Sequence, residues 1–278
     1  MNLYEWAEMI LLSPSLEDKL TPIQLSNTTF EKRQTSISDL QRPAREQRYS
    51  INNKQDKFPK KGSFSAVENR AKAMHFFANH ELLALEMMAA AILYYPTNDE
   101  NDHLLKKGIA NALMDEQKHF SLYLKRMNQL GVDFGDFSIN DFFWRYFKNT
   151  KSIQHFVCMM SLTFESANLD FSLFYRDAYH EFDDTQSAQI MQEVYDDEVS
   201  HVALGVNWVK KWLKQSEYNS IWEFYRMHLP EGLSPARSKG TIFDIEGRKK
   251  SGLDQAFIND LEVYRDSFSV VNRSTWNR

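Results

Sequence analysis

The chain has 278 residues, 42% hydrophobic and 26% charged, which is a globular composition and excludes a disordered protein. Its net charge of −5 gives no general reason to expect a polyanionic partner, and its single cysteine, Cys158, excludes an internal disulfide framework. Nine Gly and seven Pro are few for this length, so long helices are favoured over turn-rich β structure.

Residues 1–64 are predicted to form an N-terminal helix and an extended basic arm packed on the rest of the protein. The helix, at about 4–11, is amphipathic and lacks the basic start of a signal peptide. The arm that follows is polar, has no helical period, and carries Lys32, Arg33, Arg42, Arg45, Arg48, Lys54, Lys57, Lys60 and Lys61. Such charge runs are usually solvated surface. RNA contact is the alternative, because Tyr49 and Phe58 interleave with the cations.

Residues 65–215 are predicted to form a bundle of four helices, each of about 30 residues. Their expected ranges are 65–95, 101–130, 152–180 and 185–215, with stops such as Pro96 and Gly131. Short connections make each consecutive pair an antiparallel hairpin, and a longer crossover with a short aromatic helix joins the two hairpins. This order is the ferritin-like arrangement of a four-helix bundle, so the predicted class is all-α. The most apolar stretch, 82–95, is too short to cross a bilayer.

Residues 216–278 are predicted to add helices and a loop to the same domain. A helix is expected at 221–227, a loop rich in Gly, Pro and cations at 229–250, and a last helix at 252–266. Three cations of this loop are candidates to receive an anionic substrate: Arg237, Lys239 and Arg248. Simple surface positions are the favoured alternative for them.

Two copies of Asp-Glu-x-x-His, at 115–119 and 197–201, are the most informative motif in the chain. On a helix, a Glu and a His three residues apart point the same way. A further Glu lies upstream of each copy, in the preceding helix of the hairpin. The candidate metal ligands are Glu81, Glu116, His119, Glu165, Glu198 and His201. Four carboxylates and two imidazoles from four helices suit a pair of iron or manganese ions.

A single Glu-x-x-His is weak evidence, because chance produces it and the chain holds a third copy at Glu100 and His103. That copy lies at the expected turn, where no ligand would be buried. The two other copies lie mid-helix among apolar residues, where a carboxylate is costly unless it is paired or bound to a cation. Position therefore separates the two metal-binding copies from the third.

The ligand from the first long helix is open between Glu81 and Glu86. Glu81 shares its helix face with apolar residues and stands at a height above the turn similar to that of Glu116. Glu86 shares its face with Lys72 and Asn79, which indicates a polar or solvent-facing line. We favour Glu81 and keep Glu86 as the alternative.

Residues beside the ligands suggest the surroundings of the centre. A ligating His usually donates its other N–H to a carboxylate, and Asp115 and Asp197 are placed to serve the His of the opposite hairpin. Ordinary salt bridges are the alternative for both. Tyr123 and Tyr195 are candidates to line a substrate or oxygen pocket, with core packing as the alternative. His80 is expected to point off the metal face, and substrate entry is expected near the crossover or the late loop.

With these ligands, residues 65–215 resemble the ferritin-like di-iron carboxylate superfamily. Within it the chain looks like a bacterial ferritin-like family of unassigned function, which is similar to the tRNA hydroxylases that oxidise a hypermodified adenosine. The motifs that carry this resemblance are Arg42-Pro43-Ala44-Arg45, His80-Glu81-Leu82, Asp115-Glu116-x-x-His119, Leu130-Gly131-x-x-Phe134-Gly135-Asp136 and Arg248-x-x-x-Gly252. The connection after Pro96 is longer here. The resemblance implies dioxygen chemistry and names no substrate.

The expected function is that of an oxygen-activating oxidoreductase with two iron ions, or manganese or a mixed pair, that hydroxylates an unidentified small organic molecule. Its expected partners are dioxygen or peroxide and an external electron donor, because the sequence has neither a dinucleotide fingerprint nor a cysteine cluster. The alternatives are a tRNA-modifying hydroxylase, a ferritin-like protein that handles iron or peroxide, and a bundle that uses the ions only as structural ties. A cytoplasmic location without membrane contact is expected, and a homodimer is one option for its assembly.

Overall fold

The computed structural model describes residues 1–36, 38, 40, 42–52 and 56–266. Within these ranges the regular elements are helices, and the only β pairing is an isolated bridge between Arg33 and Thr97. The predicted all-α class is therefore confirmed. Lys54 of the predicted basic arm and residues 267–278 of the predicted C-terminal unit lie outside the described residues.

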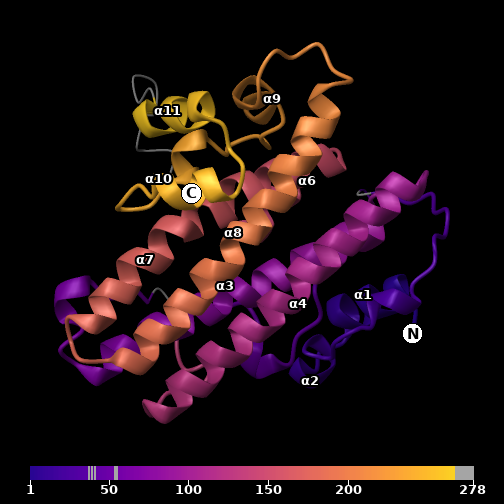
Figure 1. Ribbon diagram of the computed structural model, residues 1–278. Helices are drawn as coiled ribbons and strands as arrows, with labels where there is room; N and C mark the ends of the chain where they lie inside the picture. The colour runs from indigo at the N-terminus through magenta and orange to yellow at the C-terminus, as the bar shows by residue number, and fades with distance from the viewer. Residues whose placement is uncertain (37, 39, 41, 53–55, 267–278) are drawn as a thin grey trace, which may run out of the picture.

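Two long helical hairpins form the body of the protein (Figure 1). Their elements are α3 (Val67–Tyr94), α4 (Glu100–Gln129), α6 (Ile153–Met159), the π-helical segment η5 (Met160–Glu165), α7 (Ser166–His180) and α8 (Thr185–Leu213). The first hairpin packs α3 along α4, the second packs η5 and α7 along α8, and α4 contacts α8 between them. The crossover carries α5 (Phe142–Phe147), which packs on α3. Each long helical pattern is found within two residues of its predicted ends.

Capping side chains set where the long helices begin. Asp99 accepts hydrogen bonds from the backbone N–H groups of Asn101 and Asp102, and so satisfies donors at the start of α4. Asp184 caps α8 in the same way. Asp184 also pairs with Arg70 on α3 at 3.1 Å and with Arg126 on α4 at 2.7 Å, so this cap ties the two hairpins together.

The sequence predicts one continuous α-helix over 152–180. The structure differs, because the segment η5 within this helix is π-helical. A π-helical segment shifts the direction of the side chains that follow it. Thr163 Oγ1 donates to the Cys158 carbonyl at 2.9 Å and provides this oxygen with a partner. The neighbouring helix α8 approaches closely, since a Cβ at Gly205 would collide with Ser161. Cys158 is buried in the core as predicted.

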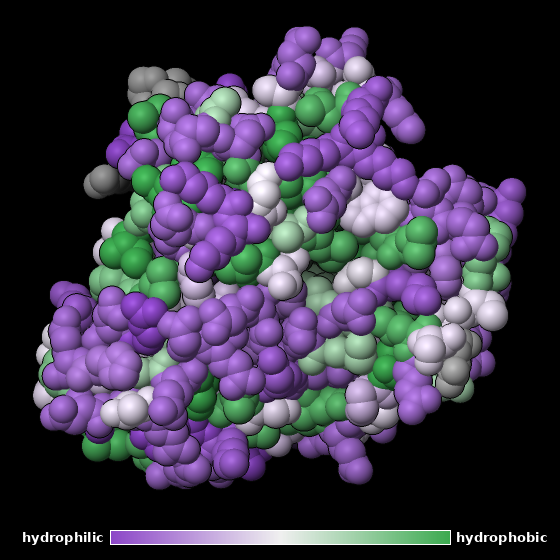
Figure 2. Space-filling view, in the orientation of Figure 1, coloured by the Kyte–Doolittle hydropathy of each residue, from purple (hydrophilic) through white to green (hydrophobic). Residues whose placement is uncertain are grey.

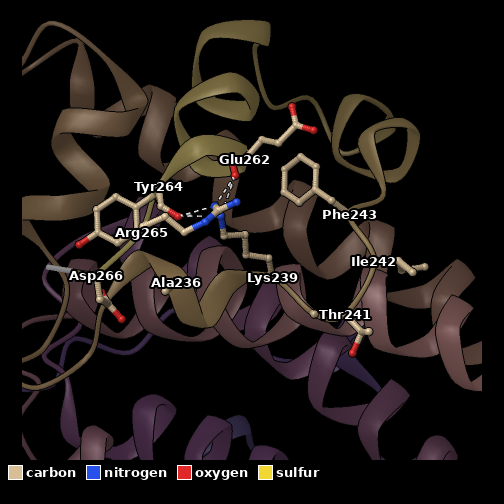
Figure 3. A pocket seen from close by; sticks show the side chains of 10 residues that line it. Ala236, Lys239, Thr241, Ile242, Phe243, Glu262, Tyr264, Arg265 and Asp266 are labelled. Carbon is tan, nitrogen blue, oxygen red and sulfur yellow. Dashed lines mark hydrogen bonds between the residues drawn. The ribbon is translucent and has the colours of Figure 1, made fainter. Parts of the chain in front are cut away.

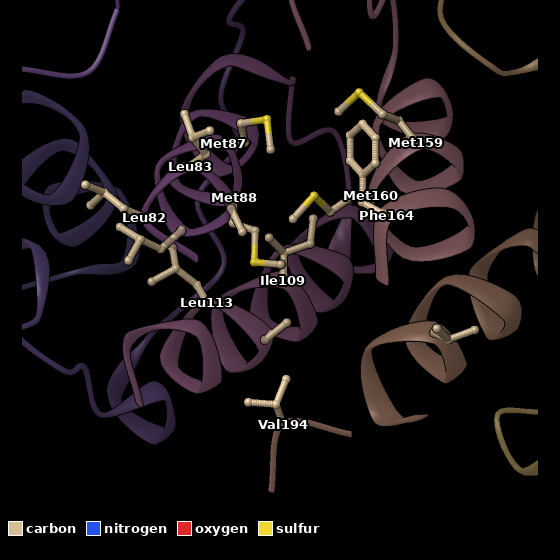
Figure 4. Close-up of a cluster of buried hydrophobic side chains, with 14 of the residues drawn as sticks. Leu82, Leu83, Met87, Met88, Ile109, Leu113, Met159, Met160, Phe164 and Val194 are labelled. Atoms are coloured by element: carbon tan, nitrogen blue, oxygen red, sulfur yellow. The ribbon is translucent and has the colours of Figure 1, made fainter. Parts of the chain in front are cut away.

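Apolar side chains from both hairpins fill the space between the helices. Figure 4 shows Leu82 and Met88 of α3, Ile109 and Leu113 of α4, and Met160 of η5 gathered in this core. By length and composition α3 is a candidate to cross a membrane, which differs from the expectation for residues 82–95. However, 89% of its apolar window is buried inside the protein, which identifies α3 as the core helix of the bundle.

The N-terminal segment folds as helices and turns over α3. Its elements are α1 (Leu3–Leu12), α2 (Leu16–Lys19), η1 (Leu25–Asn27), η3 (Gln47–Tyr49) and η4 (Lys61–Ser63). The segment brings Lys19 and Arg45 onto Glu86, with Lys19 Nζ at 3.2 Å and two Arg45 hydrogen bonds at 2.6 and 3.0 Å. Glu86 is completely buried. The predicted solvent-facing line through Glu86 is therefore wrong, because the arm covers it and supplies its counter-ions.

The C-terminal segment is more ordered than predicted. It contains α9 (Ile221–Met227), η6 (Pro235–Ser238), α10 (Ile245–Lys250) and α11 (Gln255–Val263), so the predicted loop at 229–250 holds two helical elements. Arg248 is completely buried and forms a bidentate pair with Asp170 of α7 at 2.6 and 2.9 Å. The surface position predicted for Arg248 is wrong, because Asp170 and three carbonyl oxygens receive its guanidinium. Hydrophilic residues cover most of the face shown in Figure 2.

Replacing Glu86 with Gln should lower the free energy of unfolding by about 3–5 kcal/mol, because two buried cations, Lys19 and Arg45, would lose their counter-charge. Urea denaturation followed by circular dichroism measures the change. The matched control is Glu246→Gln, which breaks the exposed pair with Lys249. We expect the control to change stability by less than about 0.5 kcal/mol. Equal effects of the two substitutions would contradict the structural role of Glu86.

Candidate metal centre

The six candidate ligands come from four helical segments and meet in the core. Glu81 lies on α3, Glu116 and His119 on α4, Glu165 at the end of η5, and Glu198 and His201 on α8. Each is at most 4% exposed. The pairing of Glu and His three residues apart works as helix geometry requires, since both side chains of a pair lie on one face.

The ligand atoms form two groups that share Glu116. The first group is Glu81, Glu116 and His119, and the second is Glu116, Glu165, Glu198 and His201. Within each group the atoms lie within 4.8 Å of one another. Two adjacent ions with Glu116 between them would use all six side chains.

Each imidazole directs Nδ1 toward the carboxylate cluster and Nε2 away from it. His119 Nδ1 lies 3.3 Å from Glu116, and His201 Nδ1 lies 3.1 Å from both Glu116 and Glu198. The Nε2 atoms face the aspartates of the opposite hairpin: His119 meets Asp197 at 2.9 Å. His201 meets Asp115 at 3.2 Å. This arrangement holds Nε2 as the N–H donor and leaves Nδ1 free to bind a metal.

Burial and mutual repulsion disfavour the charged form of two of the carboxylates. Burial first, and then the charge of Glu116, raises the pKa of Glu81 well above its usual value. Burial and the charges of Glu198 and Glu116 raise the pKa of Glu165 in the same way. Burial would also raise the pKa of Glu116, but its hydrogen bonds to His119 and His201 lower it below the usual value.

The imidazoles respond in the opposite sense. Burial lowers the pKa of His119, but the hydrogen bonds to Asp197 and Glu116 outweigh it and raise the value to about 9. The pKa of His201 is raised well above normal by its contacts with Asp115 and Glu116, against the effect of burial. Without a metal cation, protons on the glutamates and histidines therefore neutralise the cluster. A bound metal would displace these protons.

Counter-ions distinguish this cluster from every other buried carboxylate in the described part of the chain. Glu86 pairs with Lys19 and Arg45, Asp170 with Arg248, and Asp184 with Arg70 and Arg126. By contrast, the described residues supply no Lys or Arg ion pair to the four clustered carboxylates, which are Glu81, Glu116, Glu165 and Glu198.

One oxygen of the cluster supports the same conclusion. Glu165 Oε1 is buried and has no hydrogen-bond partner among the described residues. A buried polar atom of this kind requires an explanation, and an ion is one that the donor set fits. Oxygen and imidazole ligands of this number and type suit iron and manganese. The residues present therefore fit a pair of such cations.

Two alternatives from the sequence are resolved by position. Glu86 points to the arm and belongs to neither ligand group, so it does not replace Glu81. The third Glu-x-x-His copy is also excluded from the groups, although His103 is 4% exposed and packs against Phe30. The expectation that nothing is buried there is wrong for His103, since the N-terminal segment covers it. Glu100 is exposed, so this copy lacks the second ligand.

The two candidate tyrosines are buried side chains of the core. Tyr123 is buried, its hydroxyl faces Met191 Sδ at 3.6 Å, and its ring packs against Phe77. Burial, and then the nearby charge of Glu81, raises the pKa of Tyr123 well above normal. Tyr195 donates to Asp244 Oδ2 at 2.8 Å and so links α8 to the cap of α10. Core packing, the alternative kept for both residues, describes their positions.

Sequence reasoning missed Asn168, which lies beside a pocket where the crossover and the late loop meet, the two places at which substrate entry is expected from the sequence. Asn168 Nδ2 donates to Glu198 Oε1 at 3.0 Å, and Asn168 also lines a pocket of about 220 Å³. The spacing between Glu165 and Asn168, three residues on one helix, could have indicated this neighbour. The pocket itself joins the crossover to the late helical segment, and no local pattern predicts that contact. Its lining residues are His80, Phe142, Phe143, Phe164, Ala167, Asn168, Phe171 and Arg237.

Comparison with known proteins places the chain in a family. A family model described as "Protein of unknown function (DUF455)" matches residues 12–259, a segment that contains all six candidate ligands. The chain belongs to this family. A relative from Haemophilus influenzae, described as "Uncharacterized protein", is 24% identical over 155 residues, or 53% of this chain and 53% of the relative. The chain thus matches about half the length of that relative. No solved structure matches.

Replacing Asp197 with Asn should weaken metal binding by about 10–100-fold, because His119 would lose the anionic acceptor that orients it. Isothermal titration with Mn²⁺ or Fe²⁺ under anaerobic conditions measures the affinity. The matched control is Glu193→Gln, one helical turn away, where the carboxylate contacts Lys118 rather than a histidine. Unchanged affinity in the Asp197 variant would contradict the orienting role.

Proposed function

We propose that the protein is a di-iron oxidoreductase that activates oxygen on a ferritin-like four-helix bundle and hydroxylates a small organic molecule. The observation that carries this proposal is the buried cluster of four carboxylates, to which the described residues offer no Lys or Arg partner and which two histidines complete. Two groups of ligand atoms that share Glu116 support two ions rather than one. Manganese, or one ion of each kind, suits the same ligands.

The chain's own residues would hold the ions and keep the centre dry. Glu81 and His119 would serve one ion, Glu165, Glu198 and His201 the other, and Glu116 both. Bound iron would supply redox chemistry and open positions for dioxygen or peroxide. Asp115 and Asp197 accept from Nε2 and would hold its proton in place, so Nδ1 is the nitrogen that would give up its proton to a bound metal. The surrounding apolar side chains exclude water from the reaction.

An organic substrate is favoured over iron storage by the pocket next to the centre. Asn168 lines this pocket and donates a hydrogen bond to the candidate ligand Glu198. Three phenylalanines of the pocket come from α5 and the end of η5, namely Phe142, Phe143 and Phe164. Storage of iron requires no aromatic pocket at this place. An external protein or small molecule would deliver electrons, and the cytoplasm is the proposed location.

A tRNA-modifying hydroxylase is the second candidate, and ion pairs between the arm and the rest of the protein weigh against it. Arg45 forms a salt bridge with Glu86. Lys61 lies 2.5 Å from Glu181, and Arg48 lies 3.1 Å from Asp133. Cations that neutralise carboxylates of their own chain contribute less to binding of phosphates. The arm thus acts as a structural cover of the bundle in the lead proposal.

Replacing Glu116 or His201 with Ala should reduce bound iron below two ions per chain, because Glu116 belongs to both ligand groups and His201 supplies a nitrogen ligand to one. The far-ultraviolet circular dichroism spectrum should remain helical. Metal analysis of protein loaded under anaerobic conditions measures the iron content. The matched control is Glu100→Ala, which alters the third Glu-x-x-His copy and should retain two ions. Two ions per chain in the Glu116 variant would contradict the proposed centre.

Reduced, iron-loaded protein should consume dioxygen and develop an altered ultraviolet–visible spectrum. An oxygen electrode and stopped-flow absorbance provide the measurements, with Glu116→Ala as the inactive control. Hydroxylated product from added small-molecule fractions supports the proposal, and product found only with RNA fractions supports the tRNA alternative. Hundreds of irons per particle would instead show storage, and rapid loss of peroxide with release of oxygen would show a catalase.

A further inference from the structure

The pocket beside the candidate metal centre has an apolar wall and a polar mouth. Its wall is aromatic: the rings of Phe143 and Phe164 stack with centroids 4.4 Å apart, and the His80 ring lies 4.8 Å from Phe143. Phe142 and Phe171 complete this wall. None of the residues that line it is Asp or Glu. Such a surface favours a flat, apolar ligand body and does not repel an anion.

The wall of the pocket adjoins the metal centre through one hydrogen bond and two chain neighbours of the candidate ligands. Asn168 lines the pocket and donates to Glu198 Oε1 at 3.0 Å. Phe164 directly precedes the candidate ligand Glu165, and His80 directly precedes Glu81. A molecule in the pocket therefore lies beside the residues that hold the centre.

Only one of the three late cations is available to a ligand there. Arg248 forms a salt bridge with Asp170. Lys239 donates to the carbonyl oxygens of Leu261, Glu262 and Tyr264 at 2.7–2.9 Å. Figure 3 shows Lys239 directed at the Glu262 and Tyr264 backbone in a different pocket. Arg237 is exposed, lines the aromatic pocket, and lies 5.4 Å from the Phe142 ring centroid. Within the described part of the chain, no carboxylate pairs with it.

We propose that this pocket binds a small organic acid with a flat, ring-sized apolar body, whose carboxylate is received by Arg237. The body lies among Phe143, Phe164 and Phe171, and its far end faces Asn168 and the metal centre. As the substrate pocket, this assignment rests on the proposed function. A guanidinium suits the role because it donates two parallel hydrogen bonds to a carboxylate.

The size of the pocket narrows the class of ligand. Its volume is about 220 Å³. Sites for drug-sized ligands hold roughly 300–1,000 Å³. A single-ring acid is thus a better match than a nucleotide of a folded RNA, and this difference separates the inference from the tRNA alternative.

Benzoate serves as the probe for this pocket. Benzamide controls for the ring without the charge, and acetate controls for the carboxylate without the ring. Isothermal titration of the metal-free full chain should show that benzoate binds more tightly than either. Arg237→Ala should weaken benzoate binding about tenfold, since it removes a charge-assisted hydrogen-bond donor, and should leave benzamide binding unchanged. The matched control is Arg226→Ala, an exposed guanidinium over the Trp222 ring outside the pocket, which should change neither.

Ala167→Leu provides a second test, because added methyl groups at this lining position should weaken benzamide and benzoate alike. The inference is overturned if benzoate binds no better than benzamide, or if Arg237→Ala and Arg226→Ala have equal effects. Binding that needs bound metal and ignores Arg237 would place the carboxylate on the ions and would also overturn it.

Cobalt(II) loading tests the link between pocket and centre. Benzoate should change the visible absorption of the cobalt-loaded protein, and the Arg237→Ala variant should need about tenfold more benzoate for the same change. An unaltered spectrum with bound benzoate would contradict a shared site. Benzoate binding by a chain that takes up no metal would refute the proposed function while supporting the acid pocket. Metal uptake without benzoate binding would do the reverse.

Discussion

Four glutamate carboxylates lie together in the core of the bundle, and the part of the chain that the structure describes gives them two imidazoles instead of lysine or arginine partners. Like charges at this depth repel one another and lose their hydration. The fold can hold them only with protons or with metal cations. Burial and neighbouring charge raise the pKa of Glu81 and of Glu165, which favours their protonated forms, and the convergent geometry of the candidate ligands suits metal cations.

The other buried carboxylates of the described residues differ from this cluster, because each of them pairs with a lysine or an arginine. Glu86 is neutralised by the N-terminal arm, Asp170 by Arg248 of α10, and Asp184 by arginines of the first hairpin. These pairs fasten the terminal segments and the hairpins to one another. The terminal segments therefore neutralise charge and cover the core, whereas Arg237 beside the pocket pairs with no carboxylate among the described residues.

The sequence predicted the helices well because apolar periodicity and the stops at Pro96 and Gly131 are local features. It predicted the six candidate ligands for a related reason: Glu and His at three-residue spacing share a helix face wherever the helix lies. It also paired Asp115 and Asp197 with the opposite histidines, a geometry that the structure contains. It placed Glu86 and Arg248 at the surface, because their partners are distant in the sequence and no periodic pattern records them.

The sequence also missed the π-helical segment that ends at Glu165, since its apolar residues recur much as they do in a continuous α-helix. It missed the short helix α10 as well, since the residues there look like those of a loop. What the sequence determined alone is the all-α class, the hairpin order and a doubled set of candidate ligands on helix faces. Tertiary structure decided which buried carboxylates receive cations, and where the aromatic pocket meets Asn168. The physical reason is that periodicity determines the direction of a side chain on its own helix, whereas counter-charge and cavity depend on segments that meet only after folding.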